Sequence, residues 1–174
     1  MSAEPGAGHH ERLIPKFISH LNKVMSLDQE VMRVVGRVAE ARNLSFRTIE
    51  RIATCVALAR SFVPKNHLWI SAIISVLCIM KIIAPEVFRR ARDGRVTLDE
   101  IKAFLALDGS TKDIGGINTD WLVGWWKYCL SADEDRSDPE SQPFRQHLFS
   151  YGIDREYIVP AMARYLDSFQ SPPP

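Results

Sequence analysis

The stretch LSFRTIERIATCVALA places Arg47 at the start of a predicted helix, where its side chain could contact an anion. A guanidinium is planar and always charged, and it can hold phosphate oxygens through two parallel hydrogen bonds. The amides at the beginning of a helix attract the same anions. A simpler interpretation is an Arg47–Glu50 pair at i+3 on a solvated face, which contributes only about 0.2–0.5 kcal/mol. The two interpretations differ in the partner of Arg47.

A second group of cations, Arg89, Arg90, Arg92 and Arg95, surrounds a turn and is a candidate surface for nucleic-acid phosphates. This arginine cluster is short, and no aromatic residues alternate with its cations. Over the whole chain, 22 Lys and Arg face 21 Asp and Glu, which gives a net charge of +1. No overall field therefore attracts nucleic acid or an anionic membrane, and nucleic acid is the least favoured partner.

Three tryptophans, Trp121, Trp125 and Trp126, lie at i, i+4 and i+5 of one predicted helix. This spacing places Trp121 and Trp125 on the same face. Large aromatic side chains mostly supply buried area, so packing in the core is the favoured interpretation. An exposed tryptophan would instead mark a contact with another domain or protein.

The motifs of the common metal and nucleotide sites are missing from the sequence. Gly94 and Glu100 occupy the sixth and twelfth positions of a calcium loop, but Arg89 and Ala91 stand where two oxygen ligands are required. CxxC, HxxxH, GxxxxGK[ST] and GxSxG patterns do not occur. We therefore expect no catalytic residue, no metal site and no cofactor for this chain alone.

The three cysteines, Cys55, Cys78 and Cys129, lie far apart in apolar helical patterns. We interpret them as buried free thiols of a protein in the reducing cytoplasm. His9 and His10 belong to a Gly- and Pro-rich leader rather than to a metal site. The N-terminus has no basic region followed by an apolar one, so no signal peptide is expected.

Apolar residues at helical spacing predict the first three helices. The first, about residues 11–25, has an apolar face made of Leu13, Phe17, Leu21, Val24 and Met25. The second, about 28–42, opens at Asp28 and has a stripe of Val31, Val34, Val35 and Val38. The third has Ser45 as its N-cap and ends before Pro64. Its core stripe consists of Ile49, Ile52, Val56 and either Ala59 or Ala53, which leaves Arg47, Glu50, Arg51 and Thr54 on another face.

The fourth predicted helix, about residues 66–83, is apolar nearly all round and is expected to run through the middle of the domain. Its most apolar run, residues 68–80, is too short for the roughly 20 residues of a membrane span. Buried packing inside a protein therefore explains it better than insertion into a bilayer.

The remaining helices are predicted from their end signals. One begins at Pro85 and closes at Gly94 with a left-handed residue. The next begins at Thr97, which has capping-box spacing to Glu100. Two more helices are expected. The first contains the tryptophans and is capped by Thr119 or Asp120. The second is the last helix, capped by Asp154, with Pro160 as a kink or a restart.

These signals describe one all-α domain of about seven to nine helices over residues 11–170. A flexible leader is expected at 1–10 and a flexible tail at 171–174. Polar or Gly-rich composition predicts loops at 110–118 and 131–143. No internal repeat is present.

The stretch LSFRTIERIATCVALA resembles the Leu-Ser-x-Arg-[Asp/Thr]-Ile-Glu-[Arg/Lys] segment of KAP family P-loop NTPases, a group with many bacterial and phage members. Downstream, IMKIIAPEVFRRARDGRVTLDEIKAFL is similar to that family's Leu-Lys-[Ile/Val]-x-x-Pro-Glu-[Leu/Val]-[Phe/Tyr] segment, with its Gly-containing turn and acidic helix start. The resemblance spans about residues 43–105, a third of the chain or somewhat more.

In such NTPases this region follows the nucleotide-binding core and is comparable to the helical lid of AAA-type ATPases. The resemblance implies that Arg47 occupies the position of a sensor arginine, with ATP and Mg²⁺ bound by the core of a full-length parent. The phosphate-binding loop, the acidic strand end that holds magnesium and the parallel sheet are missing from this chain. It is then either the C-terminal part of a larger NTPase or a lid-like binding module.

We therefore expect a non-catalytic helical domain that packs on or regulates a P-loop core. The alternative is an independent protein–protein interaction module, including a homo-oligomer, with Trp121, Trp125 and Trp126 at its contact face. Either partner would be a protein, and no membrane span is expected.

Overall fold

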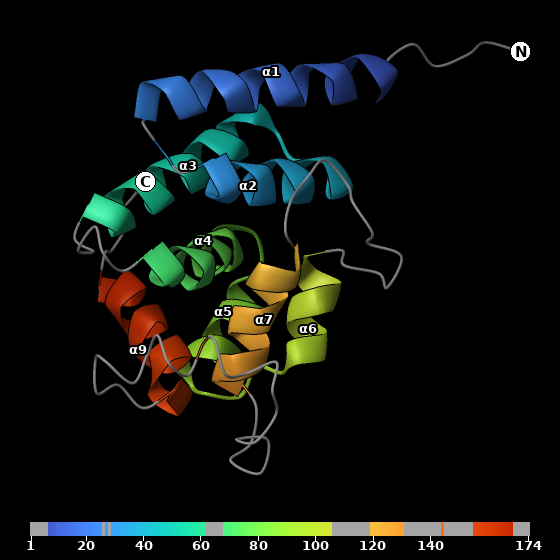
Figure 1. Cartoon of the computed structure of the whole chain (residues 1–174). Helices are drawn as coiled ribbons and strands as arrows, with labels where there is room; N and C mark the ends of the chain where they lie inside the picture. Colours follow the sequence, from blue (N-terminus) through green and yellow to red (C-terminus); the bar gives the residue numbers. More distant parts are fainter. Residues whose placement is uncertain are drawn as a thin grey trace, which may run out of the picture.

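The computed structural model describes residues 7–25, 27, 29–61, 68–105, 119–130, 144 and 155–168. Within these ranges all regular structure is helical, as the sequence predicts, and the eight helices pack on one another (Figure 1). They are α1 Ala7–Met25, α2 Gln29–Ala41, α3 Phe46–Ser61, α4 Leu68–Ile83, α5 Pro85–Arg92, α6 Leu98–Phe104, α7 Thr119–Leu130 and α9 Arg155–Ser168. No helix in the described ranges is both long and apolar enough to cross a membrane.

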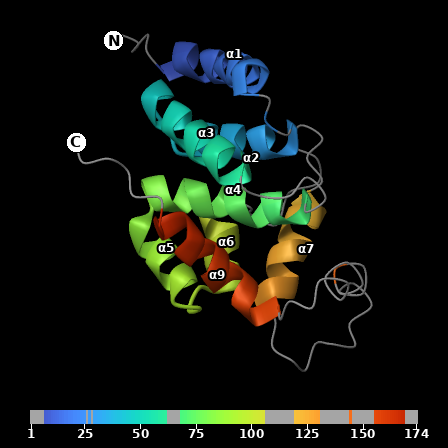
Figure 2. The same cartoon turned by 90° about the vertical axis from the view of Figure 1, so that its left-hand side faces the viewer.

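Helix α4 lies in the middle of the molecule. Figure 2 shows it between α1, α2 and α3 on one side and α5, α6, α7 and α9 on the other. It packs on α2 and α3 in the first layer and on α5, α7 and α9 in the second. Every residue from 71 to 80 is buried, which confirms the central helix predicted from its all-round apolar sequence. One buried polar group, the Ser75 hydroxyl, donates to the Ala72 carbonyl at 3.3 Å.

The N-terminal layer follows the predicted stripes except at one position of α1. The four valines of α2 are buried, and so are Ile49, Ile52, Val56 and Ala59 of α3. In α1 the buried residues are Ile14 and Leu21, whereas Val24 is 66% exposed. The prediction that Val24 faces the core is therefore wrong, because the apolar face passes through Ile14 and turns away from Val24. The helix also begins at Ala7, before the predicted start, and contains Pro15.

Two turns with left-handed residues set the directions of α3 and α6. After α2, the Leu44 N–H donates to the Ala39 carbonyl and the Asn43 N–H to Glu40, with Asn43 at φ 49°. After α5 the same pattern recurs around Gly94, whose φ is 69°. Both are Schellman motifs, and the second confirms the predicted left-handed closure at Gly94.

The starts of α3 and α6 are capped as predicted. The Ser45 hydroxyl accepts the Thr48 N–H at 3.2 Å. At α6 the Thr97 hydroxyl accepts the Glu100 N–H at 3.3 Å, and the Glu100 carboxylate accepts the Thr97 N–H at 2.9 Å. This reciprocal pair is the predicted capping box, and it explains both residues without a metal ion.

Basic side chains from distant elements cap the C-terminal ends of two helices. Arg42 donates from Nε and Nη2 to the Phe104 carbonyl at the end of α6, at 3.4 and 3.1 Å, and its guanidinium lies 4.9 Å from the centroid of the Phe104 ring. Lys81 of α4 donates from Nζ to the Leu166 carbonyl in the last turn of α9. Cations at these ends are favoured by the helix dipole and satisfy carbonyls that have no helical partner.

Helix α9 continues through Pro160, so the helix does not restart at this residue. The alternative, a kink at Pro160, stays a prediction. The predicted caps at Asp28 and Asp154, the loops at 110–118 and 131–143, Pro64 and the tail 171–174 lie outside the described residues. The side chains of Thr119 and Asp120, at the start of α7, also lie outside this description.

Candidate functional site

The first turn of α3 holds Arg47 at the surface on a well-anchored backbone. The Ser45 cap fixes the turn, and the Ser45 carbonyl also accepts the Ile49 N–H at 3.0 Å. Ile49 is fully buried, whereas Arg47, two residues earlier, is exposed. The backbone position of Arg47 is therefore determined by the core contacts of the same turn.

Arg47 makes no ion pair or side-chain hydrogen bond with any other residue that the structure describes. The ion pair with Glu50, which was the simpler interpretation, is not formed, although Glu50 is exposed three residues later. Arg51, at i+4, is a second exposed cation on the same face of the helix. Within the described ranges, no carboxylate neutralises either guanidinium.

The helix dipole makes the position of Arg47 unfavourable for a cation. The first turn of α3 contains no acidic residue. A positive side chain at a helix N-terminus costs about 0.3–1 kcal/mol, with the lower end applying to an exposed group, and a like charge at i+4 adds a few tenths. An anion at this place would be stabilised by Arg47, by Arg51 and by the helix end together. The arrangement can hold a phosphate or carboxylate.

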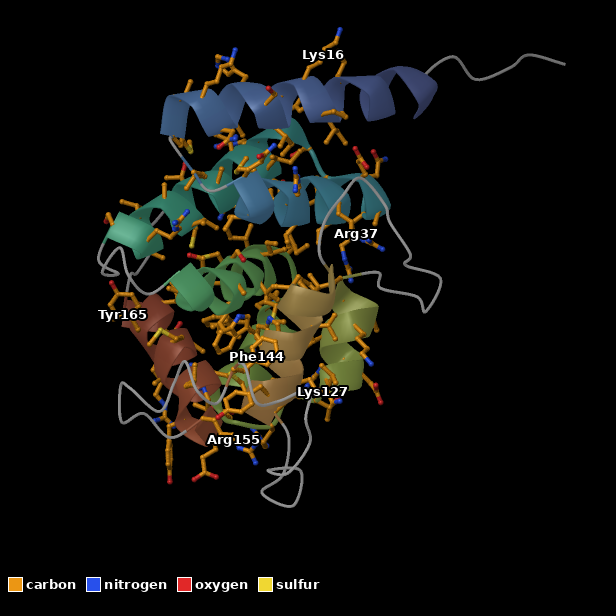
Figure 3. The ribbon with its side chains drawn as sticks, in the orientation of Figure 1. Lys16, Arg37, Lys127, Phe144, Arg155 and Tyr165 are labelled. Atoms are coloured by element: carbon orange, nitrogen blue, oxygen red, sulfur yellow. The ribbon has the colours of Figure 1, made fainter. Side chains whose placement is uncertain are left out.

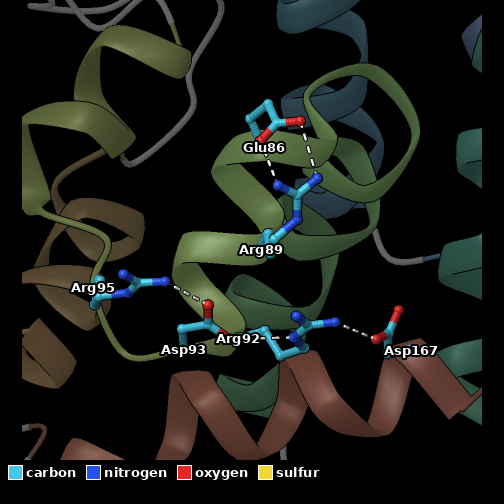
Figure 4. A network of polar contacts seen from close by, with 6 residues as sticks. All are labelled: Glu86, Arg89, Arg92, Asp93, Arg95 and Asp167. Atoms are coloured by element: carbon cyan, nitrogen blue, oxygen red, sulfur yellow. Dashed lines mark hydrogen bonds and ion pairs between the residues drawn. The ribbon is translucent and has the colours of Figure 1, made fainter.

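The four residues of the arginine cluster have a different environment, because each of them contacts a carboxylate. Figure 4 shows three of these arginines with their partners. The pairs are Arg89 with Glu86 at 2.8 Å, Arg90 with Glu100 at 2.5 Å, Arg92 with Asp167 at 2.9 Å and with Asp93 at 3.4 Å, and Arg95 with Asp93 at 2.7 Å. Four cations thus meet four carboxylates, and the cluster carries no formal net charge.

These contacts connect elements of the second layer. Arg90 connects α5 to α6 through Glu100, and Arg92 connects α5 to α9 through Asp167. A hydrogen bond from Arg95, assisted by Arg92, lowers the pKa of Asp93. The pKa of Glu100 is lowered chiefly by the hydrogen bond from the Thr97 amide and further by Arg90. The cluster therefore supports the fold, and its guanidiniums are already engaged before any nucleic acid could approach.

The tryptophans confirm the core interpretation where the structure describes them. Trp125 is 3% exposed and Trp126 is fully buried. The side chain of Trp121 lies outside the described part, so its role as an interaction residue stays a prediction. Trp125 and Trp126 are not available as contact residues for a partner that leaves the core intact.

Helix α7 also packs against an aromatic residue, Phe144, that was not among the residues predicted from the sequence. Phe144 lies beside α7 (Figure 3), with its ring centroid 4.7 Å from Trp125 and 6.2 Å from Tyr128. A Cβ atom at Gly124 would come within 2.5 Å of the Phe144 ring. Arg155, at the start of α9, lies 5.5 Å from the centroid of the Tyr128 ring. The one available signal was a glycine inside an apolar helix, which often marks a close approach.

The cysteines are free thiols, as expected. Cys78 and Cys129 are buried, Cys55 is partly buried, and all three are reduced. No group of three or more His, Cys, Asp or Glu side chains suited to a metal ion occurs within the described ranges. Comparison of the chain with protein-family models, with curated proteins and with solved structures gave no match.

Proposed function

We propose that this chain is a non-catalytic helical domain that packs on or regulates a nucleotide-binding core, as the lid-like region of a KAP-type P-loop NTPase does. The observation that carries this proposal is the exposed Arg47, which has no acidic partner within the described residues. A phosphate of a nucleotide held by the core would supply the missing negative charge. ATP and Mg²⁺ belong to that core, and this chain contributes the arginine.

The proposed action of Arg47 follows from charge and geometry. The planar guanidinium can hold two oxygens of a terminal phosphate, and the start of α3 adds the attraction of its amides. Hydrolysis and loss of the terminal phosphate remove this anion, so the domain binds the ATP-loaded core more tightly than the ADP-loaded core. Arg47 is in this sense a sensor of the nucleotide.

The proposal is tested by ATP hydrolysis in an assembly of the chain with a P-loop core. Replacing Arg47 by alanine should lower kcat at least about tenfold, since arginines on transferred phosphates contribute a thousandfold or more. The matched control is Arg164→Ala, because Arg164 is exposed on α9 and makes no ion pair within the described part. Unchanged turnover in the Arg47→Ala assembly, or hydrolysis by the isolated chain, would contradict the proposal.

A second candidate is an independent protein–protein interaction module, for which two exposed apolar side chains of the N-terminal layer would supply the contact. Val24 on α1 is 66% exposed and Leu58 on α3 is 55% exposed. Exposed apolar residues mark a contact only when they form a patch. Light scattering over a concentration series separates the two candidates. A homo-oligomer that dissociates when Val24→Glu and Leu58→Glu are introduced would favour the interaction module.

Nucleic acid remains the least supported partner. A protein binds duplex DNA mainly by replacing counterions of the phosphates with its own cations. Because Arg89, Arg92 and Arg95 already contact carboxylates, each would have to exchange an existing ion pair for a phosphate. The gain in free energy from such an exchange is small.

A further inference from the structure

Helix α7 has a gap in its side-chain surface at Gly124, and the ring of Phe144 fills this gap. The tip of the ring points at the glycine, since a Cβ atom at residue 124 would lie 2.5 Å from Cζ, 3.0 Å from Cε2 and 3.4 Å from Cε1. Contacts of a Cβ atom are essentially never shorter than 3.0 Å. The ring therefore occupies space that the side chain of any other residue at position 124 would need.

Two aromatic residues of α7 form the walls of this gap. Gly124 and Tyr128 lie at i and i+4, and Trp125 lies three residues before Tyr128, so the three are neighbours on the helix surface. The Phe144 ring centroid lies 4.7 Å from that of Trp125, with 75° between the ring planes, and 6.2 Å from that of Tyr128, with 28° between the planes. Both distances lie in the range of about 4.5–7 Å at which aromatic rings attract each other. The ring is thus edge-to-face with one wall and stacked on the other.

The walls are held by contacts that do not involve Phe144. Trp125 and Tyr128 meet edge-to-face at 6.4 Å, and Arg155 of α9 lies 5.5 Å from the centroid of the Tyr128 ring. Helix α7 itself packs on α4, α6 and α9. Trp125 and Tyr128 are buried, whereas Phe144 is only partly buried (Figure 3). We therefore expect the walls to stay in place when the ring is removed, and the gap to be reachable from solvent.

We propose that Gly124, Trp125 and Tyr128 form a binding site for one aromatic ring, the aromatic seat, in which a small uncharged aromatic molecule of the size of benzene can replace Phe144. The walls are aromatic, and the glycine leaves room for the edge of a flat ring. Phe144 is the internal competitor, because a group of the same chain acts at an effective concentration of about millimolar. The proposal is independent of the proposed function, since the seat lies on the opposite side of α4 from α3 (Figure 2).

The binding experiment uses the full chain and fluorobenzene, a neutral ring whose fluorine NMR signal reports binding directly. Phe144→Ala vacates the seat and should bind fluorobenzene saturably, with an affinity at least about tenfold higher than that of the wild type, in which Phe144 competes. The substitution should lower the Tm by about 5–10 °C, because it leaves a cavity beside α7. Fluorobenzene should recover part of this loss, since it binds the folded chain.

Gly124→Ala tests the contact between the glycine and the ring through a change of sign. In the wild type the new methyl group overlaps Cζ of Phe144, so the Tm should fall by about 2–6 °C. In Phe144→Ala the overlap is gone, and the Tm should rise by about 1–4 °C, because alanine is the better helix former. The methyl group then occupies the seat, so the double variant should no longer bind fluorobenzene.

Phe46→Ala is the matched control, because Phe46 is also partly buried and its ring centroid lies 4.8 Å from that of Phe17. This variant should lose stability without binding fluorobenzene. No binding to Phe144→Ala, equal binding to Phe46→Ala, or a fall in Tm on Gly124→Ala in both backgrounds would each overturn the proposal. If Phe144→Ala fails to fold, Phe144→Leu replaces it in the Tm comparison, where the same change of sign is required, because leucine lacks the Cε and Cζ atoms that meet Gly124.

Discussion

The start of α3 and the end of α5 both present arginines at helix termini, but their electrostatic environments are opposite. In α5 the arginines lie in the last turn, where the helix dipole favours a cation, and carboxylates contact each of them. In α3, Arg47 lies in the first turn, where the dipole disfavours a cation, and within the described residues no carboxylate contacts it. The arginine cluster is therefore paired with carboxylates of the same chain, whereas Arg47 is not paired with any carboxylate that the structure describes.

A dense run of basic residues is therefore a poor guide to a binding surface. The partners of the arginine cluster include Asp167, which is 75 residues from Arg92 and is brought close by the packing of α5 on α9. A basic side chain is a candidate for binding an anion from another molecule when no carboxylate of its own chain contacts it. By that criterion Arg47 is the stronger candidate.

The largest expected effect comes from the turn that holds the arginine cluster. Gly94→Ala forces a residue with a Cβ into a positive φ, which should lower the free energy of unfolding by about 1–2 kcal/mol. The added Cβ would lie 3.5 Å from Pro160, an ordinary contact, so the cost comes from backbone conformation. Urea denaturation measures it. Asn43→Gly, at the equivalent turn before α3, should cost nothing, because glycine adopts that φ readily; equal losses in both variants would contradict this account.

Charge reversal should change stability with opposite signs at the two sites. Arg47→Glu should raise the free energy of unfolding by about 0.3–1 kcal/mol, because a carboxylate suits a helix start and can pair with Arg51 at i+4. Arg92→Glu should lower it, because the new carboxylate would face Asp93 and Asp167. Both differences should shrink in 1 M salt, which screens charges beyond about 3 Å. A loss of stability in Arg47→Glu would remove the contrast between the two sites.

Acid should weaken the arginine cluster but not the start of α3. A carboxylate whose pKa is lowered by folding contributes stability that is present above its unfolded pKa and lost as the pH falls through its folded pKa. The pKa values of Asp93 and Glu100 lie below their ordinary 3.8 and 4.5, so this loss should develop below about pH 4.5. Glu100→Gln should have a lower Tm at pH 7 and a shallower fall in acid. Arg47→Ala should follow the wild-type curve, and a flattened curve would reveal a carboxylate partner.

Much of the fold follows from local rules that the sequence displays. The Ser45 cap, the Thr97–Glu100 box and the Gly94 turn depend on residues three to five positions apart, so their spacing predicts them. The burial of α4 follows from its composition alone. Val24 was assigned to the core wrongly, because two overlapping stripes fit α1 and only packing on α2 and α3 selects the one through Ile14.

The candidate site could be predicted only in part, because contacts between distant residues decide which of its arginines are paired. Exposure of Arg47 follows from the stripe that buries Ile49. The absence of the Glu50 pair depends on side-chain directions, and the neutralisation of Arg92 by Asp167 depends on helix packing. Spacing along one chain contains neither kind of information.

Arg47 contacts no carboxylate within the described residues and is open to an anion from another molecule, whereas the arginines of the cluster are already paired. The most direct measurement is NMR of the arginine Nε–Hε groups during titration with inorganic triphosphate. The Arg47 signal should shift first, ahead of the signal of Arg164, an exposed arginine remote from a helix start, while the signals of Arg89 and Arg92 should stay in place. Movement of the Arg89 and Arg92 signals before that of Arg47 would contradict this expectation.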